Sequence, residues 1–407
     1  MTIQRLPREL LVMTLAMIVA NLAGAMYYPI LPLYLETLGA TVQEVGLYFT
    51  LEVILSICFR ILGGWISDNM GRLPTIALGG LLGLGAIIGF TLAPSWEWAI
   101  LGALFGAMGS SLVGPSFQAY TAEQAPEGNV SSTYGLVNGL FLVCMIVGPL
   151  LGGFLAERFG FKIMLWVATG IFALATVMRV WMARRARLAL GTLRPAGLLG
   201  ELRGLLGLLL SGGLLLWLFV TDGLVDASTQ LALPFLPKYV TEVGGLSETA
   251  YGALFALMSL VSAVAMWPGG MFADRFGERR SIALGVTLFG AAWALVILLP
   301  QAAVFGMAFA LAGAGQAFVS PAFSALISKA VPRASLGITW GVFMTALGVL
   351  AIPAPYLGGL LYDNLRPEAT FILAAACTLL AAPLALWKLH MPAPVAEAAG
   401  APLTGSR

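Results

Sequence analysis

The segment GGWISDNMGR, residues 63–72, decides the fold, because it returns much later in the chain as GGMFADRFGERR, residues 269–280. In both copies two glycines stand before three variable residues, an aspartate, two more residues and a further glycine. Gly64 recurs as Gly270, 206 positions later, and each copy follows a long apolar run. The repeat therefore predicts that one structural unit is used twice.

The composition places this repeated unit in a lipid bilayer. The chain has 407 residues, of which 59% are hydrophobic and 10% are charged, and its mean hydropathy is +0.94. Soluble domains carry roughly 25% charged residues, so this composition predicts an integral membrane protein with lipid as its surroundings. The net charge of +2 excludes nucleic acid as a plausible partner.

The cysteines and the histidine give no sign of a metal or redox site. Cys58, Cys144 and Cys377 all lie in apolar stretches, as small core residues do. His390 is the one histidine, so histidine clusters are excluded. We expect no disulfide, no metal and no cofactor.

Twelve apolar runs are long enough to cross a membrane as helices, which need about 20 residues each. Backbone groups cannot stay unpaired in lipid, and the runs are continuous rather than alternating, so helices are predicted and a β-barrel is excluded. The basic start of the chain resembles a signal peptide, but the run behind it is too long, and we expect a retained first helix. The predicted spans are residues 10–34, 43–67, 76–93, 97–118, 133–156, 163–183, 212–237, 249–272, 281–299, 301–326, 336–360 and 369–389.

The same shift of 206 links further positions, which extends the repeat over both halves. Pro115 matches Pro321 and Pro149 matches Pro355, and with one residue slipped Pro29 matches Pro234. Six helices are an even number, so the two copies enter the membrane from the same side as parallel repeats. The predicted parts are a six-helix bundle at 1–183, a basic linker at 184–206, a second bundle at 207–390 and a tail at 391–407.

The distribution of basic residues predicts the orientation. With the N-terminus inside, the linker arginines and most other Lys and Arg residues fall on the inner side. The outer side then holds only Arg158, Lys162, Lys238 and Arg366. The positive-inside rule therefore places both termini in the cytoplasm.

In this orientation both glycine–aspartate segments follow the second helix of their unit and lie on the cytoplasmic side. Their small residues allow helices to approach, and the later glycine permits a sharp turn. The carboxylates lie near exposed helix ends, and the arginines are placed to pair with carboxylates of neighbouring loops. We interpret the two segments as a conformational latch formed by Gly64, Asp68, Gly71, Arg72, Gly270, Asp274, Arg275, Gly277 and Arg279.

These segments resemble the loop signature of the major facilitator superfamily, Gly-x-x-x-Asp-Arg/Lys-x-Gly-Arg/Lys. Asn69 and Glu278 replace basic residues of that signature. The resemblance covers helix number, duplication and linker. It implies an all-α membrane protein with twelve helices in two six-helix repeats, which works by alternating access around a central site.

The fifth predicted helix resembles the antiporter motif of drug–proton exporters in that superfamily. Gly135, Gly148, Pro149, Gly152 and Gly153 stand at its spacing, with Cys144 in the place of a glycine. The resemblance implies a hinge in an exporter of the inner membrane. The alternative is a small-residue packing seam that says nothing about the direction of transport.

Four charged residues inside the spans are candidates for proton coupling. Glu52 lies about nine residues into its span, or about 14 Å deep at 1.5 Å per residue, and Asp222 is similarly deep. Asp226 shares the face of Asp222, and Arg60 shares the face of Glu52. A charge in lipid is costly, so the carboxyls are expected to load and release protons. The alternatives are a snorkelling role for Arg60 and structural hydrogen bonds for the carboxyls.

The predicted substrate cavity is apolar and aromatic, with a few polar points. Few fixed charges and many aromatic residues favour lipophilic substrates, including cations that the carboxyls attract. The candidate cavity residues are Asn21, Tyr27, Tyr28, Phe117, Asn138, Trp217, Gln316, Trp340 and Phe343.

The predicted function is proton-coupled export of lipophilic or drug-like compounds by a monomer, with the small substrate and protons as partners. Two alternatives remain open at this point. One is a lipid, sugar or metabolite carrier, working as a uniporter or symporter of the same fold. The other is a membrane sensor without transport. No ATP-binding loop and no catalytic group is found, so neither a primary pump nor an enzyme is expected.

Overall fold

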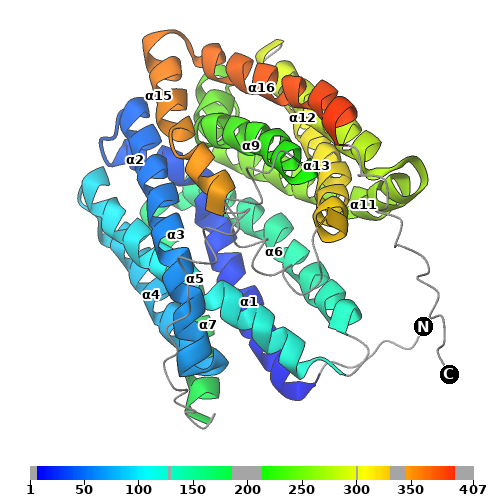
Figure 1. Cartoon of the computed structure of the whole chain (residues 1–407). Helices are drawn as coiled ribbons and strands as arrows, with labels where there is room; N and C mark the ends of the chain where they lie inside the picture. Colours follow the sequence, from blue (N-terminus) through cyan, green and yellow to red (C-terminus); the bar gives the residue numbers. More distant parts are fainter. Residues whose placement is uncertain (1–6, 127–129, 186–212, 299–300, 331–344, 390–407) are drawn as a thin grey trace, which may run out of the picture.

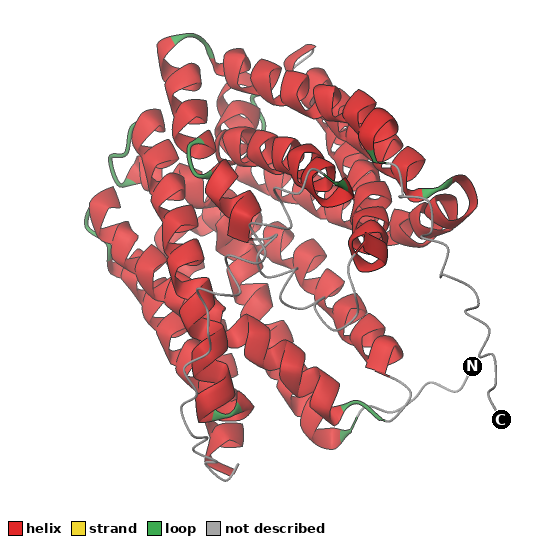
Figure 2. Cartoon of the chain, viewed as in Figure 1, coloured by secondary structure: helices red, strands yellow, loops and turns green. Residues whose placement is uncertain are grey.

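The computed structural model describes residues 7–126, 130–185, 213–298, 301–330 and 345–389. Within these residues the chain forms helices joined by short loops, and no strand is present (Figure 2). Twelve helical segments are long and apolar enough to cross a membrane. Each of them overlaps one predicted span, so the predicted helix number and order are confirmed.

The first half contains six of the twelve spans. The short η1 (Tyr28–Ile30) and α2 (Leu31–Thr37) continue the first of them. The main helices of this half are α1 (Arg8–Tyr27), α3 (Val42–Met70), α4 (Arg72–Leu92), α5 (Trp96–Gln124), α6 (Val130–Phe159) and α7 (Phe161–Arg185).

The second half repeats this order. Its first span is extended by η2 (Leu233–Phe235), α10 (Leu236–Lys238) and η3 (Tyr239–Val243), which match η1 and α2 of the first half. The fifth span of this half, which is the eleventh of the chain, covers Thr345–Asn364, with a turn before α15. The main helices are α9 (Leu214–Ala232), α11 (Glu248–Phe276), α12 (Glu278–Leu298), α13 (Ala302–Ala330), α15 (Ala354–Asn364) and α16 (Pro367–Lys388).

The turn glycines of the two copies do the same structural task. Gly71 separates α3 from α4 with a φ of 85°, and Gly277 separates α11 from α12 with a φ of 91°. A residue with a Cβ is strained at such a φ, so glycine is required at both turns. The predicted turn after each aspartate is present in both halves.

Helix packing repeats with the same register. A Cβ added to Gly79 on α4 would lie 2.8 Å from the carbonyl oxygen of Gly109 on α5. At the equivalent Gly285 on α12, the added Cβ would lie 2.6 Å from the carbonyl oxygen of Gly315 on α13. Since each of these residues is 206 positions from its counterpart, the internal duplication extends to individual helix contacts.

The two halves meet at one end of the molecule, which we call the closed end. There α6 finishes and α3 and α11 begin, and the main contacts between halves are α3 with α15 and α6 with α11. Figure 1 shows the helices of the two halves diverging from this end. The opposite end carries the first residues of α1 and the last residues of α7 and α16.

A large hydrophobic core fills the closed end. Its largest side chains are fully buried aromatic residues from both halves, including Tyr34, Phe235, Tyr239, Tyr251 and Phe371. Tyr34 also donates a hydrogen bond of 2.8 Å to the carbonyl oxygen of Phe90. Burial of this much aromatic surface stabilises the contact between the halves.

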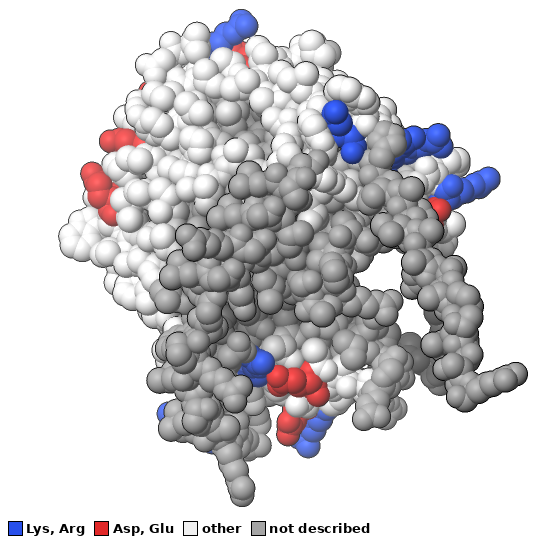
Figure 3. All heavy atoms as spheres, in the orientation of Figure 1, with Lys and Arg blue, Asp and Glu red and all other residues white. Residues whose placement is uncertain are grey.

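The surface agrees with a membrane environment. Large apolar side chains such as Val177, Val264 and Trp267 are more than half exposed, as expected for positions that face lipid. On the face seen in Figure 3, the described charged side chains lie toward the ends of the helices. The predicted cytoplasmic position of the termini and the domain boundaries at residues 183, 206 and 390 stay predictions. Most of the linker and the whole tail lie outside the described residues.

Candidate functional site

A polar cavity of about 430 Å³ lies between the two halves. From the first half it is lined by one face of α3 and by Tyr28, and from the second half by α9 and residues near α15. Three carboxylates and one guanidinium face this space within membrane-spanning helices. The charged and polar residues that line it are Tyr28, Glu52, Ser56, Arg60, Asp222, Asp226 and Gln230.

The predicted face of α3 is turned toward this cavity. Glu52, Ser56 and Arg60 recur every fourth residue and all three line it. The hydroxyl of Tyr28 donates a long hydrogen bond of 3.4 Å to Glu52 Oε2. Arg60 shares the cavity with Glu52 on its own helix and with Asp226 on the other half. The cavity therefore brings opposite charges from the two halves into one space.

Asp222 and Asp226 on α9 are shared by two cavities. Both residues line the polar cavity, and both also line a second pocket inside the second half. They are one helical turn apart, so they repel each other when both are ionised. These two carboxylates thus stand at the boundary between the polar cavity and the second pocket.

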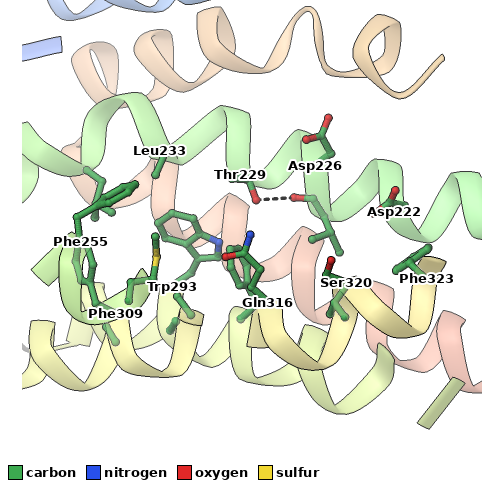
Figure 4. Close-up of a pocket in the computed structure, with 18 of the residues that line it drawn as sticks. Asp222, Asp226, Thr229, Leu233, Phe255, Trp293, Phe309, Gln316, Ser320 and Phe323 are labelled. Carbon is green, nitrogen blue, oxygen red and sulfur yellow. Dashed lines mark hydrogen bonds between the residues drawn. The ribbon is translucent and has the colours of Figure 1, made fainter. Parts of the chain in front are cut away.

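The second pocket has a volume of about 480 Å³ and is formed by α9, α11, α12 and α13 with the segment after α9. Its lining is mainly apolar and aromatic. Figure 4 shows Phe255 and Phe309 at one end of the pocket, and Asp226 and Asp222 toward the other. Trp293, Gln316 and Thr229 lie next to one another between these ends, and the carboxylate of Asp226 points away from Gln316.

This arrangement follows from helix direction. α9 runs toward the closed end, so Asp222 and Asp226 lie farther from that end than Leu233. α13 runs the other way, and its Phe309 is therefore near the closed end. The lining therefore has its carboxylates away from the closed end and several of its aromatic rings near that end.

The predicted substrate residues are only partly brought together. Tyr28 lines the polar cavity and Gln316 lines the second pocket. Asn21 donates a hydrogen bond of 2.8 Å to the carbonyl oxygen of Met17, one turn earlier on its own helix. Trp340 and Phe343 lie outside the described residues.

The other predicted substrate residues line neither cavity. The ring of Tyr27 packs 5.7 Å from that of Phe90. Phe117 is 6% exposed in a core of the first half. The amino group of Lys388 lies 4.8 Å from the centre of the Trp217 ring, near the opposite end. Asn138 is exposed on α6.

Sequence reasoning missed the aromatic residues that α12 and α13 contribute to the pocket. Phe289 and Trp293 are one turn apart on α12, and their rings meet edge to face at 5.9 Å. Phe309 approaches from α13. The available signal was aromatic spacing of four residues on a transmembrane helix, which is equally typical of packing and of lipid contact.

The first predicted latch segment places its arginine against an acidic residue. Arg72 Nε donates a hydrogen bond of 3.0 Å to Glu123 Oε1, at the end of α5. Gly64 and Asp68 lie in the last turns of α3. Their role in holding a conformation stays a prediction.

In the second latch segment, Asp274 and Arg275 are exposed in the last turn of α11. The guanidinium of Arg275 lies 5.3 Å from the centre of the Phe276 ring. An added Cβ at Gly270 would meet nothing within 4 Å, whereas at Gly269 it would lie 2.6 Å from the carbonyl oxygen of Ala317. Arg279 lies in the first turn of the next helix, α12, and it takes part in an interaction.

The antiporter-like segment of α6 lies within the closed-end contacts. Added Cβ atoms at Gly148 and Gly152 would meet the backbone of α1, and one at Gly153 would meet the carbonyl oxygen of Glu248 on α11. The carbonyl oxygen of Pro149 faces Gly252 of the other half. Gly135 has open space around it. The segment is thus a seam between halves in this conformation.

A charged group joins the halves at the closed end as well. Lys238 Nζ donates to Glu36 Oε2 at 2.9 Å and to Glu242 Oε1 at 2.8 Å. The side chains of Lys238 and Glu36 are only 15% and 20% exposed. Because Glu36 belongs to the first half and Lys238 to the second, this ion pair spans the interface.

No cluster of three or more metal-ligating side chains occurs in the part of the chain that the structure describes. The candidate site therefore consists of carboxylates, an arginine, aromatic rings and a central amide. Such groups bind and release ions and organic molecules without covalent chemistry.

Two homologous bundles of membrane-spanning helices with a polar cavity at their interface define a membrane transport protein rather than an enzyme. The sequence profile of the Major Facilitator Superfamily matches residues 13–225 and 218–403, and the chain belongs to this family. It is a multi-pass protein of the inner membrane. The recognition and the fold class predicted from the sequence are both confirmed.

Relatives of similar length are known from bacteria. The chain is 25% identical over 399 residues to the multidrug resistance protein MdtG of Rahnella sp. (strain Y9602), covering 94% of each chain. It is 22% identical over 355 residues to the multi-drug resistance efflux pump PmrA of Streptococcus pneumoniae serotype 4, covering 86% of this chain and 88% of that protein.

Solved structures share the fold at low identity. The nucleoside transporter NupG superposes with a TM-score of 0.77 at 12% identity, covering 93% of this chain and 99% of that one. A bacterial homologue of the iron transporter ferroportin, in an inward-facing state, superposes with a TM-score of 0.75 at 16% identity, covering 94% and 99%. These similarities support the fold and carry no information about the substrate.

Proposed function

We propose that this protein is a secondary active transporter that exports lipophilic, drug-like cations in exchange for protons. The single observation that carries the proposal is the shared position of Asp222 and Asp226, which line both the polar cavity and the apolar pocket. A cation in the pocket and a proton from the polar cavity therefore compete for the same carboxylates.

Competition of this kind produces coupling. An uncompensated carboxylate inside a membrane protein costs several kcal/mol, so the bundles rearrange most easily when Asp222 and Asp226 carry a proton or a bound cation. Each guest removes negative charge from the shared site, so binding of one weakens binding of the other. Outward movement of a cation is then exchanged for inward movement of protons.

Glu52 and Arg60 are the charged residues of the first half that take part in the proposed coupling. Arg60 lines the polar cavity opposite Asp226 of the other half, and Glu52 lines the same cavity. When the halves move relative to each other, the charge environment of the α9 carboxylates changes. We infer that this change is how the conformation and the protonation of the site become linked.

The closed end supplies the conformational part of the mechanism. In the orientation expected from the basic residues, the closed end faces away from the cytoplasm, and the polar cavity is approached from the cytoplasmic side. Contacts of α3 with α15 and of α6 with α11 hold this state. Separation of the seam would open the other side, and one chain is sufficient for the cycle.

The relatives support export of drug-like compounds, because two of them are named for multidrug resistance or efflux. Among proteins of the same fold are peptide and nucleoside transporters. The mainly apolar lining of the pocket favours a lipophilic guest over those polar substrates. A non-transporting sensor has no evident need for two cavities with shared carboxylates.

Proteoliposomes with an imposed pH gradient test the proposal, with tetraphenylphosphonium as the transported cation. Wild-type protein is expected to move the cation against its gradient, and Asp222→Asn and Glu52→Gln are expected to lose this dependence on pH. Asp363→Asn, at an exposed carboxyl near the end of α15, is the matched control. Transport that ignores the pH gradient in every variant, or pH-driven transport that survives both substitutions, contradicts proton coupling at these residues.

A further inference from the structure

We propose that the pocket of the second half selects organic cations that carry a hydrogen-bonding oxygen between the charged group and an apolar tail. Gln316 is the principal recognition group for this oxygen, and the indole N–H of Trp293 is the second. The inference rests on the proposed function for the cationic end of the guest, while the oxygen requirement is independent of it.

The length of the pocket calls for an elongated guest. Its lining residues on α13 extend from Ala308 to Ile327, which is roughly 28 Å at 1.5 Å per residue. The carboxylates lie toward one end, and Phe255 and Phe309 lie toward the other (Figure 4). A compact cation held at Asp222 or Asp226 would leave the aromatic end empty, so an extended molecule fills the space better.

Gln316 breaks the apolar lining between these ends. It sits inside a membrane-spanning helix, is exposed to the pocket, and has no side-chain hydrogen bond to another described residue. An amide in apolar surroundings is costly unless a partner satisfies it. Its carboxamide therefore offers a donor and an acceptor to whatever occupies the middle of the pocket.

Trp293 adds a second unsatisfied donor beside the same space. The residue is 5% exposed and lines the pocket, yet its indole nitrogen has no hydrogen-bond partner among the described residues. In this conformation the nitrogen is covered, and the Gln316 side chain, which no hydrogen bond holds, is free to turn. A ligand oxygen between them would accept from the amide and then from the indole.

The pocket therefore recognises three features in order. The carboxylates take the positive charge, Gln316 with Trp293 takes an ether, carbonyl or hydroxyl oxygen, and the aromatic end takes a hydrocarbon tail. A purely hydrocarbon cation still binds through its charge and tail, but it leaves both donors unpaired. An oxygen at the wrong place in the chain loses hydrophobic contact without making the hydrogen bond.

A series of matched cations tests this spacing directly. The probes are dodecyltrimethylammonium and its analogues in which one methylene is replaced by oxygen at successive chain positions. Binding is measured to the full-length protein in lipid nanodiscs without a pH gradient, with empty nanodiscs as the correction for partition into lipid. In the wild type, one or two adjacent positions are expected to bind about three- to tenfold more tightly than the other ethers.

Substitutions assign the preference to residues. Gln316→Leu is expected to remove the peak in the ether series while leaving dodecyltrimethylammonium within about twofold of wild type. Trp293→Phe is expected to lower the peak. The control Phe309→Leu removes an aromatic ring from the apolar end without removing a donor, so it should weaken all probes by a similar factor and keep the peak.

The outcomes separate this inference from the proposed function. A flat ether profile in wild-type protein, or a peak that survives Gln316→Leu, overturns the inference even where pH-driven transport is observed. A peak that Gln316→Leu removes supports the inference even where the pH gradient has no effect on transport. If Trp293→Phe does not fold, the wild-type profile and the Gln316→Leu variant still decide.

Discussion

Alanine in place of Gly46 should open the closed end. Gly46 lies on α3, where an added Cβ would stand 2.5 Å from the carbonyl oxygen of Pro355 and 3.2 Å from its carbonyl carbon. Ordinary contact begins near 3.4 Å, so the α15 segment must move by about 0.9 Å away from α3. Such a movement disturbs the hydrogen bond of 3.2 Å that Tyr356 N donates to Thr50 Oγ1 across the same seam.

The size of the effect follows from packing energetics. Overfilling a close-packed contact costs about 1–3 kcal/mol, and this cost falls only on the conformation in which α3 and α15 touch. The gain in helix propensity from glycine to alanine is present in both conformations, so it cancels in their ratio. At about 1.4 kcal/mol per factor of ten, the closed-to-open ratio should fall by about five- to 150-fold.

Distances between spin labels at the closed end measure this ratio. Leu92 at the end of α4 and Leu298 at the end of α12 are 63% and 69% exposed, belong to different halves, and accept labelled cysteines. The three native cysteines, Cys58, Cys144 and Cys377, are first replaced by alanine. In Gly46→Ala the distance distribution should gain a longer component that the parent protein populates weakly.

A control substitution separates opening of the closed end from a general effect of replacing glycine by alanine in a transmembrane helix. Gly139 on α6 has no atom within 4 Å of an added Cβ, so Gly139→Ala should leave the distribution unchanged. If Gly46→Ala also leaves the distribution unchanged while the protein remains folded, the contact between α3 and α15 does not hold the closed end, and the reasoning is refuted.

Three further substitutions probe other contacts. Lys238→Gln removes the ion pair between halves and should shift the labelled distances toward the open form by about 1 kcal/mol at low salt; in its background Glu36→Gln should add little. Gly285→Ala, at a contact inside the second half, should lower the free energy of unfolding by about 1–3 kcal/mol, measured by thermal unfolding, without shifting the labels. Arg72→Gln, at a partly exposed pair with Glu123, should change stability by at most about 1 kcal/mol, and a larger loss in the same assay would show that the pair is not a simple surface contact.

The number and order of helices could be predicted because lipid imposes a length and an apolar composition on every crossing segment. The register of 206 positions added the duplication, and the turn glycines at Gly71 and Gly277 follow it. The position of the seam could not be predicted. Small residues mark close helix contacts, but they do not say whether the partner helix belongs to the same half, as at Gly79, or to the other, as at Gly46.

The charged part of the site was accessible to sequence reasoning for an energetic reason. A charge inside lipid is costly, so Glu52 and Asp222 had to face an interior space, and both line the polar cavity. Their proposed protonation stays a prediction. The shared cavity of Arg60 and Asp226 lay beyond sequence reasoning, because these residues belong to different halves.

The apolar part of the site was less accessible, because a helix that is hydrophobic all round does not mark its inward face. Phe117 and Phe323 occupy equivalent positions in the two repeats, so the sequence pattern around them does not distinguish their roles. Phe117 packs 5.9 Å from Phe141 in a core of the first half, whereas Phe323 lines the pocket of the second. Trp293 gave no distinct signal, since tryptophan is also common at membrane interfaces.

The seam itself repeats with the register of the sequence. Gly46 faces the carbonyl oxygen of Pro355, and its repeat equivalent Gly252 faces that of Pro149, the equivalent of Pro355. The two contacts lie on different helix pairs, so their energetic costs should add. Gly252→Ala should therefore open the closed end about as far as Gly46→Ala does.

The double variant tests whether the closed end moves as one unit. If the halves separate as rigid bodies, the logarithms of the two ratio changes should add in the same labelled pair. If α3 and α15 separate independently of α6 and α11, the double variant should instead show two separate populations. The two seams would then share an origin in the duplication without opening together. That result would contradict the proposed movement of one half relative to the other.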